Sequence, residues 1–368
     1  MRILIEAVSF CEYIIQKANA LVSRGHEVML FMPHNLINST VGDDISKVIN
    51  PKIRTLFYKG KRRPNRLFYI FRNNLFKTIR DFNPDIIHVH INGEIETLLI
   101  CLRFCKIPLI VTIHDVTPHV GEDSKISLRG KIICKYLRYH AAKIHVHGET
   151  LRNELISIYP AYKKKGVVIP HGTLSLFTHW DTGNIEREPQ TCLFFGRMEK
   201  YRGLDNLVQI GSILKKMIPD IKIIVAGSGT ELCKYKESLM ALGIFEIHDA
   251  FIPDRAVYTF FRRASLLLLP YHEASQSGIV HMGLAFGVTI VATSVGAIPE
   301  TILDGVHGRV VPPDNMKGFA DAVVSLLQDR ETLGQMEKAC YEKGKQLEFG
   351  NIIEKYEDMY HEIVKNQK

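Results

Sequence analysis

The chain has 368 residues, of which 46% are hydrophobic and 23% charged, and a formal net charge of +8. This length suits two domains better than one core, and the composition excludes a disordered chain. No apolar run reaches the roughly 20 residues that span a bilayer, and Glu6 interrupts the apolar start that a secretory signal needs. Seven cysteines without a Cys-x-x-Cys pair are typical of reduced thiols, so we expect a cytoplasmic protein.

The N-terminal half alternates short apolar runs with amphipathic segments such as 16–24. The runs predict strands at 2–7, 27–32, 86–89, 109–113, 143–146 and 167–169. Alternation of this kind predicts parallel strands joined by crossover helices. We therefore expect an α/β, Rossmann-like domain over residues 1–173.

A basic and aromatic segment follows the second expected strand. Between Asp44 and Asp81 there is no acidic residue, whereas lysine, arginine, phenylalanine and tyrosine are frequent. Such a composition predicts that residues 52–80 bind an anionic membrane surface. The alternative is a solvated helix face whose aromatic residues lie in the core. Single-stranded nucleic acid is a third possibility that we do not favour, because the motifs further along the chain have no role there.

Histidines gather at the expected strand ends of this half: His88, His90, His114, His145, His147 and His171. Each His-x-His pair places two imidazoles on one face of a strand, as in some metal sites. No matching carboxylate cluster accompanies them, and strand ends collect polar groups in any case. We expect polar architecture and no metal, with a metal site as the alternative.

The most informative motif begins where the expected strand 192–195 ends. Gly196 makes a turn, Arg197 and Arg202 stand five residues apart, and a helix is expected from Gly203. Two guanidinium groups at a helix N-terminus suit a diphosphate, because both the helix dipole and forked hydrogen bonds favour negative charge. The alternative is a pair of solvated cations.

Three further segments follow in the order of an open α/β sheet. The apolar run 221–226 leads into Gly227-Ser228-Gly229, which allows a phosphate or ribose close to the backbone. The run 264–269 leads to Glu273, whose carboxylate suits sugar hydroxyls, and then to a helix start at 277–280 whose amides suit a phosphate. A strand at 288–293 and the segment 304–313 complete the series.

Taken together, these motifs resemble the retaining GT-B glycosyltransferases of family 4, also called glycosyl transferases group 1. The resemblance covers nearly the whole chain. It implies two Rossmann-like domains facing each other across a cleft, with an acceptor domain at 1–173 and a nucleotide-sugar donor domain at 190–350. It also implies that the last segment, 351–368, is a helix that crosses back to the N-terminal domain.

The resemblance also implies roles for particular residues. Arg197 and Arg202 would bind the diphosphate, Glu273 the donor sugar, and His114 would lie near the transferred sugar. The nucleotide and its phosphates would be lined by Gly196, Gly227, Gly229, Ser277, Gly278, Ile279, Val280 and His281. The sequence departs from the family at His281, since a second glutamate usually stands about there and binds the ribose. Arg202 replaces the commoner lysine, which keeps the charge.

The function that the resemblance implies is sugar transfer from a UDP- or GDP-sugar with retained anomeric configuration, without a metal or other cofactor. The expected acceptor is a glycan or a polyprenyl-diphosphate-linked oligosaccharide in cell-surface polysaccharide synthesis. Such an enzyme would be cytoplasmic or peripheral on the inner face of the cell membrane. Two alternatives remain: a catalytically inactive GT-B binding or partner protein, and a nucleotide-sugar 2-epimerase.

Overall fold

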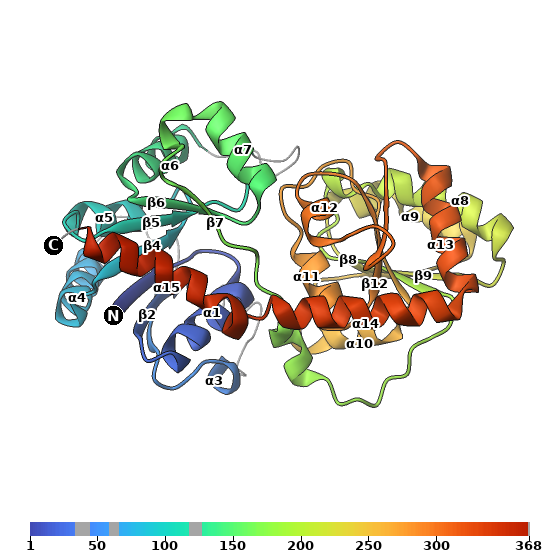
Figure 1. The fold of residues 1–368 in the computed structure, drawn as a ribbon, viewed down its shortest axis with the longest axis horizontal. Coiled ribbons are helices and arrows are strands. Elements are labelled where there is room, and N and C mark those ends of the chain that lie inside the picture. Colours follow the sequence, from blue (N-terminus) through green and yellow to red (C-terminus); the bar gives the residue numbers. More distant parts are fainter. Residues whose placement is uncertain (34–44, 59–65, 118–126, 367–368) are drawn as a thin grey trace. The chain divides into compact units, whose positions relative to one another are not determined.

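The computed structural model describes residues 1–33, 45–58, 66–117 and 127–366. The chain forms two compact units (Figure 1). The N-terminal unit is built from Met1–Val116, Ile126–Gly172 and Phe349–Lys368, and the C-terminal unit is built around Thr173–Glu348. Each unit is an α/β structure around one parallel sheet.

The sheet of the N-terminal unit contains, within the described residues, seven parallel strands in the order β3-β2-β1-β4-β5-β6-β7. All strands expected here are present. Fully buried aliphatic residues lie in β1, β2, β4, β5 and β6, each worth about 1.5–3 kcal/mol of burial, whereas β7 is only partly buried. Their bounds are β1 Arg2–Glu6, β2 Glu27–Pro33, β3 Arg54–Tyr58, β4 Ile86–His90, β5 Leu109–Thr112, β6 Lys143–Val146 and β7 Gly166–Val168.

Strand β3 lies in the basic segment and was not expected from the sequence. It pairs with β2 at the edge of the sheet, where Arg54 and Thr55 are exposed. Tyr58 is buried and stacks on Phe31 with ring centroids 4.5 Å apart. An edge strand needs only one buried face, so its short alternation is hidden among the surrounding cations.

The helices of this unit are α1 Cys11–Ser23, α3 Ile45–Val48, α4 Arg66–Phe82, α5 Ile95–Arg103, α6 Leu128–His140 and α7 Glu149–Ile158, followed by the 3-10 turn η3 Pro160–Tyr162. Helix α4 belongs to the basic segment. Its residues Leu75, Ile79 and Phe82 are buried in the core, and Phe76 is partly buried against it. The side chains of residues 66–71, which include three of the aromatic residues of the segment, lie outside the described part, so the choice between membrane surface and core stays open. Residues 59–65 of the segment lie outside the described residues.

The last helix, α15 (Phe349–Lys365), belongs to the N-terminal unit although it follows the C-terminal unit in sequence. It lies against α1, the red and blue helices of Figure 1. The Tyr13 and Tyr356 hydroxyls are 2.5 Å apart, and Glu357 accepts a hydrogen bond from His26 at 2.8 Å. Within the N-terminal unit, the last helix of the chain is therefore packed on the first one.

The sheet of the C-terminal unit has, among the residues described, six parallel strands in the order β10-β9-β8-β11-β12-β13. Strand β10 was not expected, because it is an edge strand of half-buried residues with no apolar run. The strands are β8 Thr191–Phe195, β9 Lys222–Gly227, β10 Phe245–Asp249, β11 Leu266–Leu269, β12 Thr289–Thr293 and β13 Gly308–Val311.

The helices of the C-terminal unit cover this sheet. Two 3-10 turns accompany them, one before β8 and one between β8 and α8. These elements are η4 Ser175–Trp180, η5 Lys200–Arg202, α8 Leu204–Met217, α9 Thr230–Leu242, α10 Asp254–Arg263, α11 Gly278–Ala285, α12 Ile298–Thr301, α13 Met316–Gln328 and α14 Arg330–Gln346. In the described part of the chain, no helix is both long enough and apolar enough to cross a membrane.

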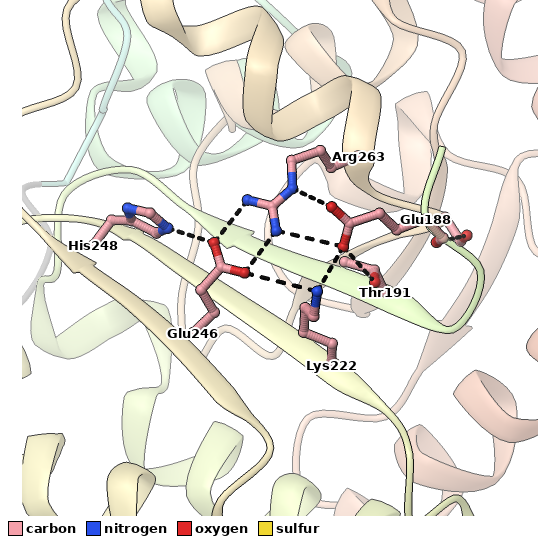
Figure 2. A network of polar contacts seen from close by, with 7 residues as sticks. Glu188, Thr191, Lys222, Glu246, His248 and Arg263 are labelled. Carbon is pink, nitrogen blue, oxygen red and sulfur yellow. Dashed lines mark hydrogen bonds and ion pairs between the residues drawn. The ribbon is translucent and has the colours of Figure 1, made fainter. Parts of the chain in front are cut away.

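The amino ends of strands β8, β9 and β10 are joined by a network of ion pairs centred on Arg263 (Figure 2). The guanidinium group of Arg263 donates to Glu188 at 2.5 Å and to Glu246 at 2.6 Å, and Lys222 donates to Glu188 at 2.9 Å. Hydrogen bonds from Arg263 lower the pKa of Glu246 to about 2. Ion pairs therefore join the amino ends of these strands. A ligand site is to be expected at their carboxyl ends.

Candidate active site

Both sheets reverse their strand order next to the first strand of the unit. The reversal lies between β1 and β4 in the N-terminal unit and between β8 and β11 in the C-terminal unit. In open parallel sheets, ligands bind at the carboxyl ends of the strands at such a reversal. The two reversals are therefore the candidate ligand sites of the molecule.

In the C-terminal unit, the loops after β8 and β9 are joined by backbone hydrogen bonds. Gly196 donates to Ala226 at 2.9 Å, and Met198 donates to Ser228 at 2.9 Å. Gly227 has φ +143°, and a Cβ atom there would lie 1.9 Å from the Gly196 carbonyl oxygen. Only glycine allows the two loops to lie so close, which brings both predicted glycine motifs into one structure.

Arg202 lies in η5, immediately before the N-terminus of α8. Its Nη1 donates to the carbonyl oxygen of Phe195 at 3.1 Å and contacts the Tyr271 hydroxyl at 3.0 Å. Burial opposes the charge of Arg202, but the neighbouring hydroxyls of Tyr271 and Tyr201 keep its pKa above the ordinary value. No contact of Nη2 is found among the described residues, so that nitrogen can donate to a ligand.

The loop that carries Glu273 is attached to the loop that carries Arg202. The Tyr201 carbonyl accepts hydrogen bonds from the amides of His272 at 2.8 Å and Glu273 at 3.4 Å. The His272 ring lies 2.8 Å from Asp205 in the first turn of α8. Glu273 itself is exposed. The predicted sugar-binding carboxylate and the predicted cation thus lie in loops that are joined by hydrogen bonds.

A pocket of about 130 Å³ lies beside these loops. It is lined by Phe195, Gly196, Arg197, Gly227, Ser228, Phe251 and Ile252. Phe251 follows the edge strand β10 and is 58% exposed, which is unusual for a phenylalanine in a globular protein. Arg197 is also exposed, so a ligand in the pocket would meet both a cation and an aromatic ring.

The start of α11 supplies the remaining residues expected to line the nucleotide. Gly278 opens the helix after Ser277, and Ile279 and Val280 follow in its first turn. His281 is 1% exposed and lies on the buried side of the helix. In this structure it offers little surface to a ribose, and its predicted contact stays a prediction.

The N-terminal unit has a different arrangement, because its predicted histidines form buried hydrogen-bonded chains. The first chain runs from Tyr360 through His88 and Thr112 to His145, with distances of 2.7, 2.7 and 2.9 Å. His145 Nε2 then donates to the Ile169 carbonyl at 3.0 Å. Burial lowers the pKa of His145 to about 3, so this chain is neutral at physiological pH.

The second chain contains His114, the predicted catalytic histidine. His114 Nε2 lies 2.8 Å from His90 Nδ1, and His90 Nε2 lies 2.8 Å from the amine of Lys17. The ring of Phe10 stacks on His114 with centroids 3.9 Å apart. His114 is 8% exposed and Phe10 43% exposed, so the outer end of this chain reaches the surface of the unit.

The carboxylate nearest to the strand reversal of this unit is Glu6, at the end of β1. It is fully buried and accepts hydrogen bonds from Thr97 at 2.8 Å and Asn92 at 3.2 Å. Burial raises its pKa to about 8. Within the described part of the chain, no group of three histidine, cysteine, aspartate or glutamate side chains is placed to hold a metal ion.

The structure thus brings Gly196, Arg197, Arg202, Gly227 and Glu273 together in the C-terminal unit and places His114 in the buried chain of the N-terminal unit. Sequence reasoning missed the residues that hold the predicted ones: Tyr201, Tyr271, Phe251, Lys17 and Phe10. Lys17 had a detectable signal, since it lies four residues before Leu21 on the apolar face of a helix.

Comparison with known proteins assigns both halves of the chain. Residues 12–173 match the family described as "Glycosyltransferase Family 4", and residues 189–329 match the one described as "Glycosyl transferases group 1". The chain is 25% identical over 325 residues to a phosphatidyl-myo-inositol mannosyltransferase of Mycolicibacterium smegmatis, covering 86% of this chain and 80% of that protein. It is 26% identical over 303 residues to a D-inositol 3-phosphate glycosyltransferase of Corynebacterium diphtheriae, covering 75% and 70%.

Solved structures show the same fold. Sucrose-phosphate synthase from Thermosynechococcus elongatus superposes with a TM-score of 0.76 at 16% identity and full coverage of both chains. Anabaena HepE in complex with UDP-glucose gives a TM-score of 0.72 at 12% identity, covering 98% of this chain and 100% of that one. The fold is therefore GT-B, with two Rossmann-like domains.

Proposed function

The chain belongs to glycosyltransferase family 4 and is a transferase enzyme, and from that premise we propose that it moves a sugar from a UDP- or GDP-sugar to a glycan or lipid-linked acceptor with retention of configuration. The observation that carries the proposal is the set of joined loops around Arg197, Arg202 and Glu273. Each of its parts suits one part of a nucleotide-sugar.

The diphosphate is the part that the cations select. Arg202 is held in place by Phe195 and Tyr271 but keeps Nη2 for a ligand, and Arg197 lines the adjoining pocket. Hydrogen bonds from guanidinium to phosphate oxygens are about twice as strong as neutral ones. Two such groups would stabilise the charge that develops on the leaving diphosphate, without a divalent metal.

The nucleoside is the part that the pocket suits. Phe251 and Ile252 supply apolar surface for a flat base, and Ser228 and the two glycines leave backbone groups close to a ribose. HepE is a structural neighbour that was solved with UDP-glucose, which supports a nucleotide-sugar as the ligand class.

The transfer step then needs few further groups. Glu273 would accept hydrogen bonds from donor-sugar hydroxyls, and His114 would contact a hydroxyl of the sugar substrate. The bond between the anomeric carbon and the phosphate oxygen breaks, and a bond to the acceptor oxygen forms on the same face. The proton of the acceptor hydroxyl passes to the leaving phosphate oxygen. The arginines favour this step because they stabilise the diphosphate more as its charge grows.

The acceptor class is proposed from the relatives and from charge. The Mycolicibacterium relative is named as acting on a phosphatidyl-inositol lipid, and the chain carries a net charge of +8. Both support a glycan or lipid-linked acceptor in cell-surface polysaccharide synthesis. They also support an enzyme that works at the inner face of the cell membrane, where cations attract anionic lipids.

The proposal is tested by measuring thermal stability of the full chain with UDP, GDP, ADP and CMP. A ligand at one hundred times its dissociation constant adds about 2.7 kcal/mol, which is several degrees for domains of this size. We expect one nucleotide to raise the melting temperature, and Arg197→Ala to abolish most of that rise. Arg202→Ala should do the same, but it also loses contacts within the protein.

Lys200→Ala is the matched control, because Lys200 is an exposed cation in the same loop between the two arginines. It should leave the nucleotide-dependent rise unchanged. If no nucleotide stabilises the wild-type chain, or if Lys200→Ala and Arg197→Ala act alike, the proposed donor site is wrong. A chain that binds nucleotide but transfers no sugar would instead be an inactive GT-B protein, and one that interconverts donor epimers would be an epimerase.

A further inference from the structure

Lys17 is a lysine at a position where apolar residues are expected. It lies on the buried face of α1 with Ile14 and Leu21, and its side chain is 0% exposed. Its amine contacts His90 Nε2 at 2.8 Å and lies near the rings of Tyr13 and Tyr356. A buried amine is costly, so an amine with one hydrogen bond to the described residues needs an explanation.

No ion pair between Lys17 and a carboxylate is found in the parts of the chain that the structure describes. The titratable groups around it come from α1, the strand ends and α15: Tyr13, His88, His90, His114, His145 and Tyr356. Tyr360 and His171 contact members of this group in turn, at His88 and Tyr13. Burial lowers the pKa of Lys17 well below its usual range. Burial thus favours the neutral amine, which has a lone pair and can accept a hydrogen bond.

In the neighbouring chain of hydrogen bonds, from Tyr360 to the Ile169 carbonyl, the group at one end determines which atom donates in every bond. The Ile169 carbonyl only accepts, so His145 Nε2 carries a proton and His145 Nδ1 accepts from Thr112. The Thr112 hydroxyl must then accept from His88 Nε2, and His88 Nδ1 accepts from Tyr360. One backbone carbonyl determines both tautomers.

The chain of His114 has no carbonyl at its inner end, and Lys17 takes that place. When the Lys17 amine accepts from His90 Nε2, His90 Nδ1 is unprotonated and accepts from His114 Nε2. Nδ1 is then the remaining polar atom of His114, with a lone pair. The stacked ring of Phe10 holds the imidazole plane.

We propose that Lys17 and His90 are positioning residues for the transfer reaction, which set the tautomer of His114 so that its Nδ1 accepts a hydrogen bond from a hydroxyl of the sugar substrate. This inference rests on the proposed function, because it takes His114 to contact that sugar. It assigns a role to a buried amine that packing alone does not explain, since a methionine of similar length would fill the same space without the cost of burying an amine.

The first test is the tautomer of His114 in protein labelled with ¹⁵N in the histidine rings, with the signal assigned by its loss in His114→Gln. In the wild-type chain we expect a protonated Nε2 and an unprotonated Nδ1. Lys17→Met removes the acceptor at the end of the chain, so His114 should populate both tautomers.

Tyr356→Phe is the matched control, because it removes another buried polar group beside Lys17 while it keeps the ring. It should leave the tautomer of His114 unchanged. A wild-type tautomer in Lys17→Met, or the same change in Tyr356→Phe, would overturn the proposal.

The second test is the rate at which each variant hydrolyses UDP-glucose or GDP-mannose, with water as the acceptor. We expect Lys17→Met to lower kcat about tenfold with little change in KM, since one hydrogen bond in the transition state is lost and the diphosphate site is intact. His90→Phe, which keeps a ring in place, should do the same, and the double variant should be no slower than either.

The two proposals fail in different ways. A wild-type chain that neither binds nor hydrolyses any of the donors would refute the proposed function and, with it, the catalytic role of this chain of residues. A wild-type chain that hydrolyses a donor no faster than Lys17→Met would refute only the role of Lys17. Additive losses in the double variant would likewise refute it.

Discussion

The two units share one strand order but fill the reversal of that order in different ways. In the C-terminal unit, glycines at 196, 227 and 229 keep side chains out, and the exposed Arg197 lines a pocket. In the N-terminal unit, the same position is occupied by Glu6, His90 and the amine of Lys17, all nearly or fully buried. One reversal is thus open and cationic, and the other is filled with neutral polar side chains.

This difference shows what each reversal can do. An open reversal bordered by backbone amides and guanidinium groups binds an anion directly. In the filled reversal, the outermost group of the hydrogen-bonded chain is His114, and we propose that this unit acts through it. It also makes the N-terminal unit sensitive to pH, because neutral histidines in the interior must stay uncharged.

The largest expected effect is loss of the N-terminal unit in acid. Burial lowers the folded-state pKa of His88, His90, His114, His145 and His171. The unfolded chain takes up protons as the pH falls below about 6.5, whereas the folded unit does not, so stability is lost as the pH falls through that value. Between pH 7 and pH 5, each histidine that stays neutral in the folded unit lowers the free energy of unfolding by roughly 2 kcal/mol. The sum over these histidines is comparable to the whole free energy of unfolding of a typical domain.

The two units can be followed separately in that experiment. Trp180, the one tryptophan of the sequence, belongs to the C-terminal unit, so its fluorescence reports that unit. Hydrogen exchange in β4 and β6 reports the other. We expect exchange in β4 and β6 to rise at a pH where Trp180 fluorescence is still native. If native Trp180 fluorescence and exchange protection in β4 and β6 were lost at the same pH, the two units would not differ in acid sensitivity.

The next largest effect is expected for Gly227→Ala in the C-terminal unit. The new Cβ atom would lie 1.9 Å from the Gly196 carbonyl, at a φ of +143°. We expect a loss of about 3 kcal/mol or more in the free energy of unfolding, and loss of nucleotide binding. Gly243→Ala is the control, since Gly243 also has a positive φ but no atom near its Cβ position. Thermal melts followed by Trp180 fluorescence measure both variants. Equal losses of stability in Gly227→Ala and Gly243→Ala would show that the contact between residue 227 and the Gly196 carbonyl is unimportant.

A smaller effect is expected for Glu6→Gln. The raised pKa of Glu6, about 8 because of burial, means that folding favours its protonated form. Stability is therefore present below about pH 4.5 and lost as the pH rises through 8. At pH 9 the variant should be more stable than the wild type, and at pH 5 this difference should be much smaller. Urea titrations at both pH values measure this, and an equal difference at both would disprove it.

The smallest effect is expected at the amino edge of the C-terminal sheet. Arg263→Ala breaks the pairs with Glu188 and Glu246, which are partly exposed, so we expect a loss of about 1 kcal/mol and unchanged nucleotide binding. Arg309→Ala removes a more exposed pair with Asp304 and should cost less. Reduced nucleotide binding in Arg263→Ala would show that this edge is coupled to the ligand loops.

Sequence patterns predicted the central strands of both sheets and the edge strand β7, because these contain short apolar runs. They did not predict the edge strands β3, β10 and β13, whose partly exposed residues resemble loop composition. They also predicted that Arg202 and Glu273 belong to one site, since parallel strands bring their carboxyl ends to one edge. They did not predict that the Tyr201 carbonyl joins the two loops, because a contact with the backbone depends on the path of the chain and not on residue type.

The sequence by itself determined the α/β class, the family, the two glycine turns and the two cations, because each depends on neighbours close along the chain. Only the tertiary structure decided that residues 13, 17, 90, 114 and 356 form one buried cluster, since they come from different elements of the N-terminal unit, α1, α15 and the strand ends. It also decided which histidines are connected by hydrogen bonds, and from this we infer the direction in which the hydrogen bonds of each chain run. That direction depends on a carbonyl or an amine at the end of each chain, and only packing brings these groups within hydrogen-bond distance.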